Sequence, residues 1–228
     1  MNVILSYKNF YPKYINFLKS KDNSVIEGGI HIKINYNSPY IDLTTLYLGI
    51  PPMCLPFGIC QYNNKHDEKN NNKYYLDFSF SGIEKNNDLK VFYNKLEELD
   101  NTIINYVLEN KDLFQDYIDY DKNIVSSYVP QIRYNINKIT NEKSFNFPPT
   151  IKIKLSKNED DNFKIDFRDN NNNPLNGSEK DIKGSKASGI IECNGIWFAN
   201  KKFGITWKLI KLKIEKYPNR IGTYKFLD

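Results

Sequence analysis

The sequence predicts a mainly β protein with one long helix, folded as a single domain. Short segments in which apolar and polar side chains alternate occur on both sides of one segment with helical periodicity. Connections rich in Asn, Gly and Pro separate them, as is typical of barrels built from short strands. With 228 residues, of which 40% are hydrophobic and 26% charged, the chain is long enough to bury a substantial core.

Two strands are expected before the helix. Every second residue from Ile30 to Tyr36 is apolar, which is typical of a half-buried strand. Residues 74–80 alternate in the same way, and the pattern places Tyr75, Asp77 and Ser79 on the outward face. Between these strands, residues 43–60 contain Pro and Gly and predict an apolar connection over one end of the core. Residues 63–73 predict a polar loop.

The helix is predicted for residues 88–110. Apolar side chains recur there at spacings of three and four and form one stripe, made of Leu89, Phe92, Leu96, Leu99, Ile103 and Tyr106. Asp88 is the predicted N-cap, because its carboxylate can accept from the free amides of the first turn. We expect this helix to pack on the core and not to contact nucleic acid.

Strand patterns return in the second half of the chain. Three segments are predicted to turn apolar side chains inward, at residues 126–137, 150–155 and 163–167. In each of them the outward side chains include Lys or Arg. Residues 189–214 predict a final pair of strands joined by a turn at residues 199–202. This pair carries both tryptophans and five lysines.

Spacing divides the roles of the two tryptophans. Trp207 shares its face with apolar neighbours and is expected in the core, whereas Trp197 points opposite to Ile196 and Phe198 and is expected to face a ligand. Further along the second strand, the apolar side chains change face after Leu209. This change predicts one extra residue in the strand, a β-bulge.

The order of elements is two strands, a helix, and then four or more strands. This order predicts a Greek-key barrel of the OB type with long loop elaborations, and an open α+β sheet is the main alternative. The chain shows no internal repeat and no change of composition that would separate two domains. We therefore expect one domain over residues 1–228, with a core at about 25–217 and an N-terminal extension at 1–24.

Positive charge is concentrated near the end of the sequence. Residues 183–228 contain ten Lys or Arg and three acidic residues, a balance of +7, whereas residues 1–182 carry −2. A polyanion is the partner that such an asymmetry favours. No apolar run is long enough to span a membrane, and the first residues do not form a signal peptide. The three cysteines are expected to be free thiols in an intracellular, reducing compartment.

Patterns typical of enzymes and metal sites are missing from the sequence. It contains no phosphate-binding Gly-rich loop, and neither of its two histidines has a zinc-ligand spacing to a cysteine. His66 lies with two acidic residues in the polar loop, and the pair Asp160–Asp161 lies in a turn. Cys193 lies within a predicted strand and is expected to be an inert thiol. We expect no catalysis and no cofactor.

The final strand pair resembles a known family. Three short segments resemble the C-terminal signature of the single-stranded-DNA-binding proteins of nucleocytoplasmic large DNA viruses, the asfarvirus type. They are Ile196-Trp197-Phe198, Lys201-Lys202-Phe203-Gly204 and Thr206-Trp207-Lys208. SSYVPQIR (126–133) and FPPTIKIKL (147–155) are similar to two further strands of that family. The resemblance implies an OB-fold viral protein that coats unwound DNA during replication or repair in the host cytoplasm.

The matching strands supply the candidate binding residues. For contacts with phosphates these are the basic residues on outward faces or loops, namely Arg133, Lys152, Lys154, Lys183, Lys186, Lys201, Lys202 and Lys208. For stacking on bases they are Tyr128, Trp197 and Phe203, and then Tyr75, at roughly 1–3 kcal/mol per stacked base.

Two other functions remain open at this stage. One is a virion or assembly protein whose basic face docks an acidic protein, and the other is an RNA-binding barrel. The expected partners are single-stranded DNA, a second copy of the chain in a homo-oligomer, and replication proteins. No membrane contact is expected.

Overall fold

Five strands close a barrel in this computed structural model, which describes residues 3–18, 24–26, 29–62, 73–119, 123–175 and 182–217. They are β7 (Tyr47–Cys54), β9 (Lys73–Ser79), β14 (Thr150–Leu155), β16 (Lys186–Ala199) and β17 (Lys202–Lys216). The strand order is β7-β9-β14-β17-β16, and β16 pairs again with β7 to close the ring. All neighbours are antiparallel except β14 and β17, which run parallel. The predicted OB-type Greek-key barrel is confirmed.

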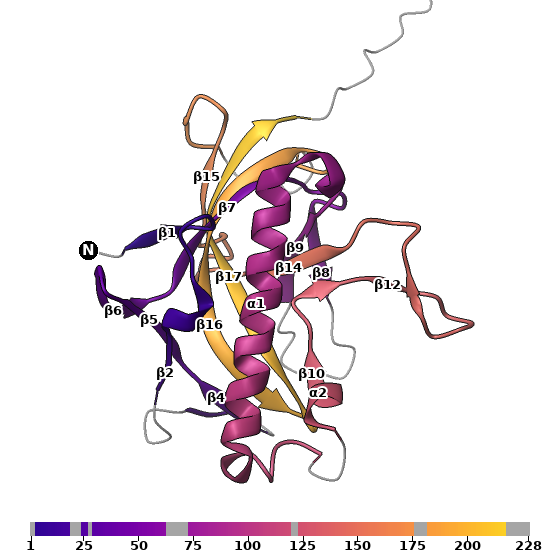
Figure 1. Cartoon of the computed structure of the whole chain (residues 1–228). Coiled ribbons are helices and arrows are strands. Elements are labelled where there is room, and N and C mark those ends of the chain that lie inside the picture. The colour runs from indigo at the N-terminus through magenta and orange to yellow at the C-terminus, as the bar shows by residue number, and fades with distance from the viewer. Residues whose placement is uncertain are drawn as a thin grey trace, which may run out of the picture.

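Shorter strands extend the barrel sheet (Figure 1). They are β1 (Ile4–Ser6), β3 (Ser24–Ile26), β4 (Gly29–Ile32), β8 (Ile59–Tyr62), β10 (Tyr128–Val129), β11 (Ile132–Arg133) and β15 (Asp166–Arg168). A three-stranded sheet contains β2 (Ile15–Phe17), β5 (Ile34–Ser38) and β6 (Ile41–Thr45), and a separate hairpin contains β12 (Asn135–Ile136) and β13 (Lys143–Ser144). The helices are α1 (Asn87–Glu109) and α2 (Ile124–Ser127), with 3-10 turns at Pro12–Tyr14, Ile83–Lys85 and Lys111–Leu113.

The core lies inside the barrel and between the barrel and α1. The alternating side chains from Ile30 to Tyr36 are buried as predicted, although the chain passes from β4 to β5 at Lys33 and so enters a second sheet. Leu76 and Phe78 of β9 are also buried. Residues 4–17, expected as an extension, join the fold through β1 beside β7 and β2 beside β5.

The expected connection at residues 43–60 is wrong, because residues 47–54 within it form barrel strand β7. Proline is normally excluded from central strands since it donates no ladder hydrogen bond. Pro51 and Pro52 are accommodated by a shift in register, where both stand opposite the single residue Ser188 of β16. A β-bulge of this kind leaves residues without ladder partners, so the missing donors cost little.

A second bulge confirms the predicted extra residue in the last strand. Ile190 pairs with Lys211 and Ile191 pairs with Leu209, so Ile210 has no counterpart on β16. A third irregularity, at Gly195, has a φ of +98°. A Cβ atom there would lie 2.1 Å from the carbonyl oxygen of Ile32, so this close approach of β16 to β4 requires glycine.

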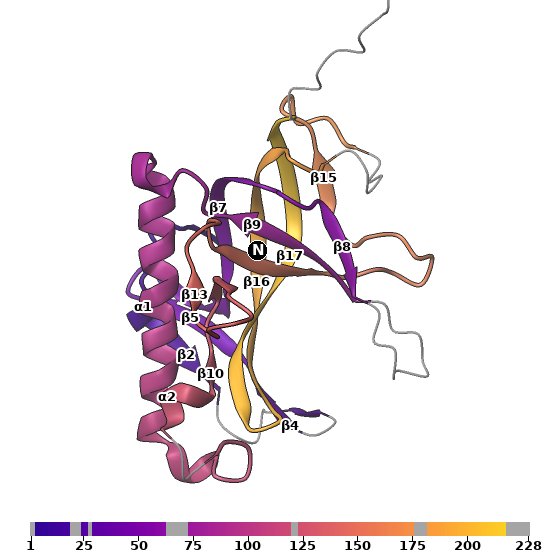
Figure 2. The ribbon, with the colours of Figure 1, turned by 90° about the vertical axis from the view of Figure 1, so that its right-hand side faces the viewer.

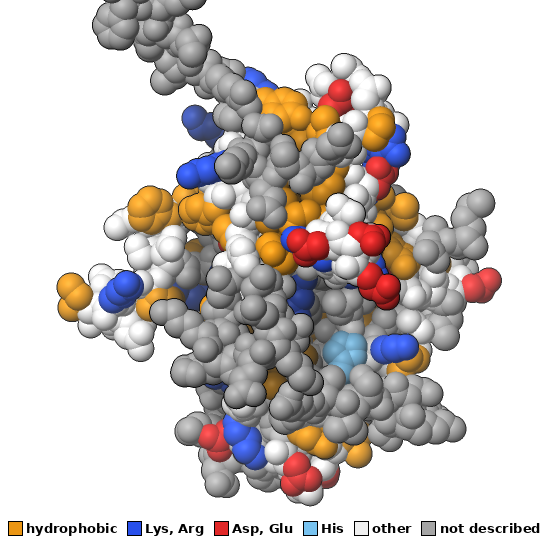
Figure 3. Space-filling model, turned by 180° about the vertical axis from the view of Figure 1, so that it is seen from behind, with side chains coloured by type: hydrophobic (Ala, Val, Ile, Leu, Met, Phe, Trp, Pro, Cys, Tyr) orange, Lys and Arg blue, Asp and Glu red, His pale blue; other side chains and the backbone are white. Residues whose placement is uncertain are grey.

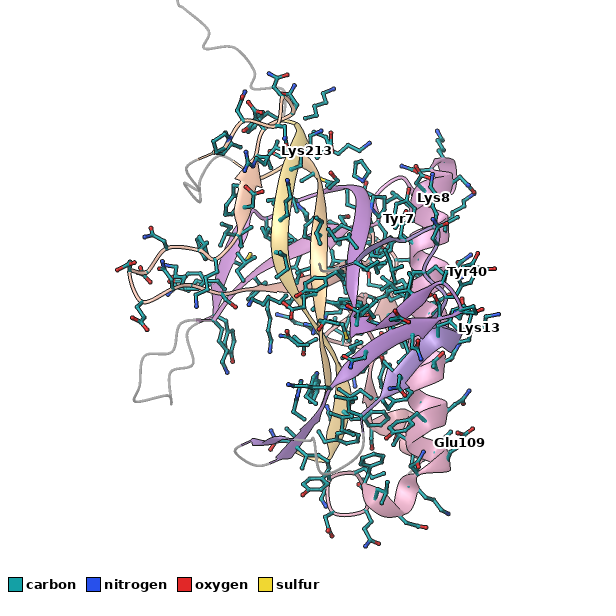
Figure 4. The ribbon with its side chains drawn as sticks, turned by 90° about the vertical axis from the view of Figure 1, so that its left-hand side faces the viewer. Tyr7, Lys8, Lys13, Tyr40, Glu109 and Lys213 are labelled. Atoms are coloured by element: carbon teal, nitrogen blue, oxygen red, sulfur yellow. The ribbon has the colours of Figure 1, made fainter. Side chains whose placement is uncertain are left out.

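Helix α1 follows the predicted stripe but begins differently. The N-cap is Asn86, whose side chain accepts from the amides of Asp88 and Leu89 at 3.0 and 3.3 Å. Asp88, the predicted cap, instead lies in the first turn and forms an ion pair with Lys8 at 2.8 Å. Figure 4 shows Lys8 and Tyr7 beside this end of the helix. The helix therefore starts one residue earlier than the pattern indicated, and its first turn is tied to the N-terminal segment.

A buried hydrogen-bond network joins α1 to the barrel. Asp100 of α1 accepts from the hydroxyl of Tyr128 and from the side-chain amide of Gln131. Its second oxygen accepts from the backbone amide of Gln131 at 3.3 Å. Gln131 in turn accepts from the indole N–H of Trp207, which is buried in the core as predicted. A buried carboxylate costs much less free energy when its lone pairs are occupied in this way.

Tyr128→Phe should lower the free energy of unfolding by about 1.5–3 kcal/mol, because it removes a hydrogen bond to a charged acceptor. Urea unfolding measures the change. Tyr40→Phe is the matched control, since Tyr40 is 95% exposed and should change the free energy by less than about 0.5 kcal/mol. A loss at Tyr128 no larger than the loss at Tyr40 would show that the network does not hold the helix.

Candidate nucleic-acid interface

The outer side of strands β8, β9, β14 and β11 brings basic and aromatic side chains together. Strand pairing sets Tyr75 beside Lys154 and Asp77 beside Lys152. Arg133 of β11 follows, beside Thr150 at the start of β14. We call this surface the β9–β14 face and define it by Tyr75, Asp77, Arg133, Lys152 and Lys154. Strand register alone therefore gathers four of the predicted binding residues.

Tyr75 and Lys152 form a cation–π pair at the centre of the β9–β14 face. The Lys152 ammonium lies 3.4 Å from the centroid of the Tyr75 ring, and both side chains are half-buried. Burial lowers the pKa of Lys152, the Arg133 charge lowers it further, and Asp77 opposes both. An aromatic ring and a partly desolvated cation are thus held side by side, where one nucleotide could contact both.

The positive surface continues toward β17 and β4. The Lys154 side chain is exposed at its surface. Partial desolvation lowers its pKa, and the charges of Lys73 and Arg133 lower it further. Lys208 of β17 is its backbone neighbour in the parallel pair. Burial lowers the pKa of His31 on β4, and the Lys154 charge lowers it further. Lys154 and His31 therefore lie close enough for their charges to interact.

Trp197 lies at the far end of this surface. It is half-buried, while Ile196 and Phe198 are fully buried, so the prediction that it points away from the core is confirmed. It pairs with His31 and with Gly204, and its ring lies 3.1 Å from the position of a Cβ atom at Gly204. Gly204 is four residues before Lys208 on β17, roughly 13 Å away. The contact of Trp197 with bases stays a prediction.

Two of the predicted stacking residues are in the core, and that part of the expectation is wrong. Tyr128 is 7% exposed and Phe203 is fully buried. Their rings lie 5.2 Å apart, and Phe203 also stacks on Phe198 at 5.4 Å. The physical reason is that β10 pairs with β17 and sets Tyr128 opposite Phe203, while the Tyr128 hydroxyl binds Asp100 under α1. Neither ring is available to a base.

The remaining predicted cations lie at three places. Lys183 is exposed next to Gly58, and its charge acts on Cys60 of β8, so it borders the β9–β14 face. Lys186 begins β16 opposite Lys216 and lies outside the face. Lys201 and Lys202 lie at the hairpin turn beyond Trp197. The Lys201 ammonium donates to the backbone carbonyl of Asp116 at 3.0 Å, which draws it toward the end of α1.

A pocket that sequence reasoning missed lies at one end of the β9–β14 face. It has a volume of about 460 Å³ and is lined by Asp77, Arg133, Lys152 and Thr150 together with aromatic and proline side chains. Phe57 and Phe147 line it while remaining 58% and 65% exposed. Each stands next to a proline in a connection between strands, and this pairing is the signal that could have identified them.

This surface and α1 lie on different sides of the barrel. Figure 2 shows α1 along one side, while β8 and β4 lie on the other. Figure 3 views that other side and shows Lys and Arg side chains among hydrophobic and acidic ones. The helix thus leaves the basic surface uncovered.

The described residues include no group of three or more His, Cys, Asp or Glu that could hold a metal ion. His66 and its acidic neighbours lie outside the described residues. The three cysteines are free, and burial raises the pKa of Cys193 to about 12, so this thiol is a poor nucleophile. Among the helices that the structure describes, none is long and apolar enough to cross a membrane.

No protein-family model and no curated protein matches the sequence. Among solved structures, the chain is similar to the single-stranded DNA-binding protein from bacteriophage Enc34 in complex with ssDNA. The identity is 13% and the TM-score 0.43, over 87% of this chain and 96% of that one. It is also similar to gp2.5, a single-stranded DNA-binding protein encoded by bacteriophage T7, at 10% identity and a TM-score of 0.45, over 80% and 98% of the two chains. Because identities and TM-scores are low, function is inferred from this chain's own residues.

Lys154→Met should raise the pKa of His31, because it removes a positive charge that disfavours the imidazolium. An NMR titration of the imidazole protons measures the shift, with His66→Asn assigning the two histidines. Lys90→Met, an exposed lysine on α1, should leave the pKa of His31 unchanged. If the pKa of His31 is equal in all three proteins, the Lys154 charge does not act on His31, and the two residues do not belong to one surface.

Proposed function

We propose that the β9–β14 face binds single-stranded DNA with little dependence on sequence. The observation that carries this proposal is the Tyr75–Lys152 pair, in which a ring and an ammonium 3.4 Å apart share one strand face. Sheets that bind single strands combine aromatic platforms for bases with cations along the backbone. Arg133 and Lys154 flank the pair, and Trp197 lies further along the same surface.

Phosphate contacts supply most of the affinity in this proposal. The five cations on or beside the face are Arg133, Lys152, Lys154, Lys183 and Lys208. Each phosphate neutralised on a single strand contributes about −0.7 to the slope of log affinity against log salt, so five contacts give a slope near −3.5. Binding should therefore be strong at low salt and weak at high salt.

Single strands suit this surface better than duplexes. Stacking on Tyr75, Trp197 or the pocket aromatics requires the flat face of a base, which a duplex hides between neighbouring base pairs. Phe57 and Phe147 are exposed hydrophobic side chains next to cations, a combination that an unpaired base can cover. Preference for single strands therefore comes from the aromatics, and affinity comes from the cations.

We further propose the biological setting that the sequence resemblance implies. The protein coats unwound DNA during replication or repair of a large DNA virus in the host cytoplasm, acting with replication proteins and as a homo-oligomer. It is not an enzyme and needs no cofactor. Localisation of a tagged copy to sites of viral DNA synthesis tests this setting.

Lys152→Gln combined with Lys154→Gln should weaken binding to oligo(dT) and make the salt slope shallower by about 1.4, since two contacts of about 0.7 are lost. Fluorescence anisotropy from about 50 to 200 mM salt measures both quantities. Lys85→Gln combined with Lys90→Gln removes the same charge from the side of α1 and should leave the slope unchanged. Salt-independent binding, or equal affinity for a duplex, would contradict the proposal.

Oligo(dT) should quench the fluorescence of Trp197, because stacking on a base brings the indole into contact with it. Trp197→Phe should lose this quenching and retain the emission of Trp207, which is buried. Competition with a ribo-oligomer and with an acidic protein separates the two alternatives. An RNA-binding barrel would favour the 2′-hydroxyl, and an assembly protein would bind the acidic protein without quenching.

A further inference from the structure

A carboxylate lines the pocket at the end of the β9–β14 face, whose other charged residues are Arg133, Lys152 and Lys154. Asp77 is only 8% exposed and borders the pocket together with Arg133 and Lys152. Phosphates carry no hydrogen-bond donor at neutral pH, so this carboxylate repels the backbone of DNA. It can contribute to binding only through donors on the bases, such as their amino groups.

The carboxylate retains acceptor capacity for a ligand. An ionised Asp accepts at about four lone-pair positions. Burial raises the pKa of Asp77, whereas the charges of Lys152 and Arg133 and a hydrogen bond from the side chain of Thr150, which occupies one position, lower it. The strand register sets Asp77 on the outward side of β9, opposite Lys152, and Asp77 lines the pocket there.

The rest of the pocket suits a planar apolar ring. Phe57 and Phe147 line it, with Pro56, Pro148 and Tyr134 completing the apolar part. Its volume of about 460 Å³ lies within the range of roughly 300–1,000 Å³ found for small-molecule sites. Arg133 and Lys152 at the same pocket can bind the phosphate that is attached to the inserted nucleotide.

We propose that this pocket receives one base of the bound strand and that Asp77 selects bases with an amino group on their pairing edge. Cytosine, adenine and guanine carry such a group, whereas thymine presents a carbonyl oxygen in its place. The site rests on the proposed single-stranded-DNA binding and adds to it a modest base preference. One pocket among several contacts biases binding and does not restrict the sequences that are bound.

The alternative role of Asp77 is to hold Lys152 and Arg133 in place by charge. In that case the carboxylate affects all oligonucleotides equally, and its removal changes the affinity for each by the same factor. Base discrimination therefore separates the two roles, and total affinity does not.

The test compares oligo(dC) with oligo(dT) of equal length at pH 8, by fluorescence anisotropy. The unmodified protein should bind oligo(dC) about fivefold or more tightly, since an Asp carboxylate accepts from the cytosine amino group. Asp77→Asn should abolish this preference, because the Asn side-chain amide can accept from the cytosine amino group and can equally donate to the thymine carbonyl oxygen. Asp42→Asn makes the same charge change at an exposed position on β6 and should keep the preference.

A second variant covers the case in which Asp77→Asn does not fold. Phe147→Ala shortens an exposed side chain and should weaken binding to oligo(dC) more than to oligo(dT). Equal affinities in the unmodified protein, or a preference that persists in Asp77→Asn, would overturn the inference and leave the proposed function intact. If neither oligomer binds, the proposed function itself fails.

Discussion

The buried carboxylate of Asp100 is the interaction on which the arrangement of the molecule depends. An ionised group in the core is tolerated only when its acceptors are filled, and here Tyr128 and Gln131 fill them. Gln131 also accepts from Trp207, so one network fixes α1, the segment before β11, and β17. Two residues after Gln131, Arg133 is exposed beside Thr150, where the pairing of β11 with β14 holds it.

The same network separates the two sides of the barrel. On one side α1 and the core aromatics exclude water, and Tyr128 is held there by its hydroxyl. On the other side, β14 turns Lys152 and Lys154 outward, where Lys152 is half-buried and Lys154 is exposed. One face of a small barrel cannot both be covered by an apolar layer and present cations to a ligand. Placing the only long described helix on one side leaves the other for a ligand.

Irregularities in the strands make this division possible. Pro51 and Pro52 of β7 and Ile210 of β17 are accommodated by shifts in register, and Gly195 lets β16 approach β4. Such bulges increase local bending, which a short sheet needs in order to close. Closure sets β14 beside β17, and it joins Lys154 to Lys208, two cations distant in the sequence, on one surface.

Periodicity along the chain was sufficient to determine much of this protein. It predicted the strands at residues 30–36 and 74–80, the helix stripe, the extra residue at Ile210 and the opposite orientations of Trp197 and Trp207, because each depends on local alternation. It missed strand β7, because Pro51 and Pro52 argue against a central strand. They are accommodated by a β-bulge that forms only where β7 pairs with β16. The choice of Tyr128 and Phe203 as stacking residues came from the strands that resemble the family, and both are buried. The pocket around Asp77 was overlooked. Alternation shows which side chains share a face, whereas only the tertiary structure decides which face a second layer covers.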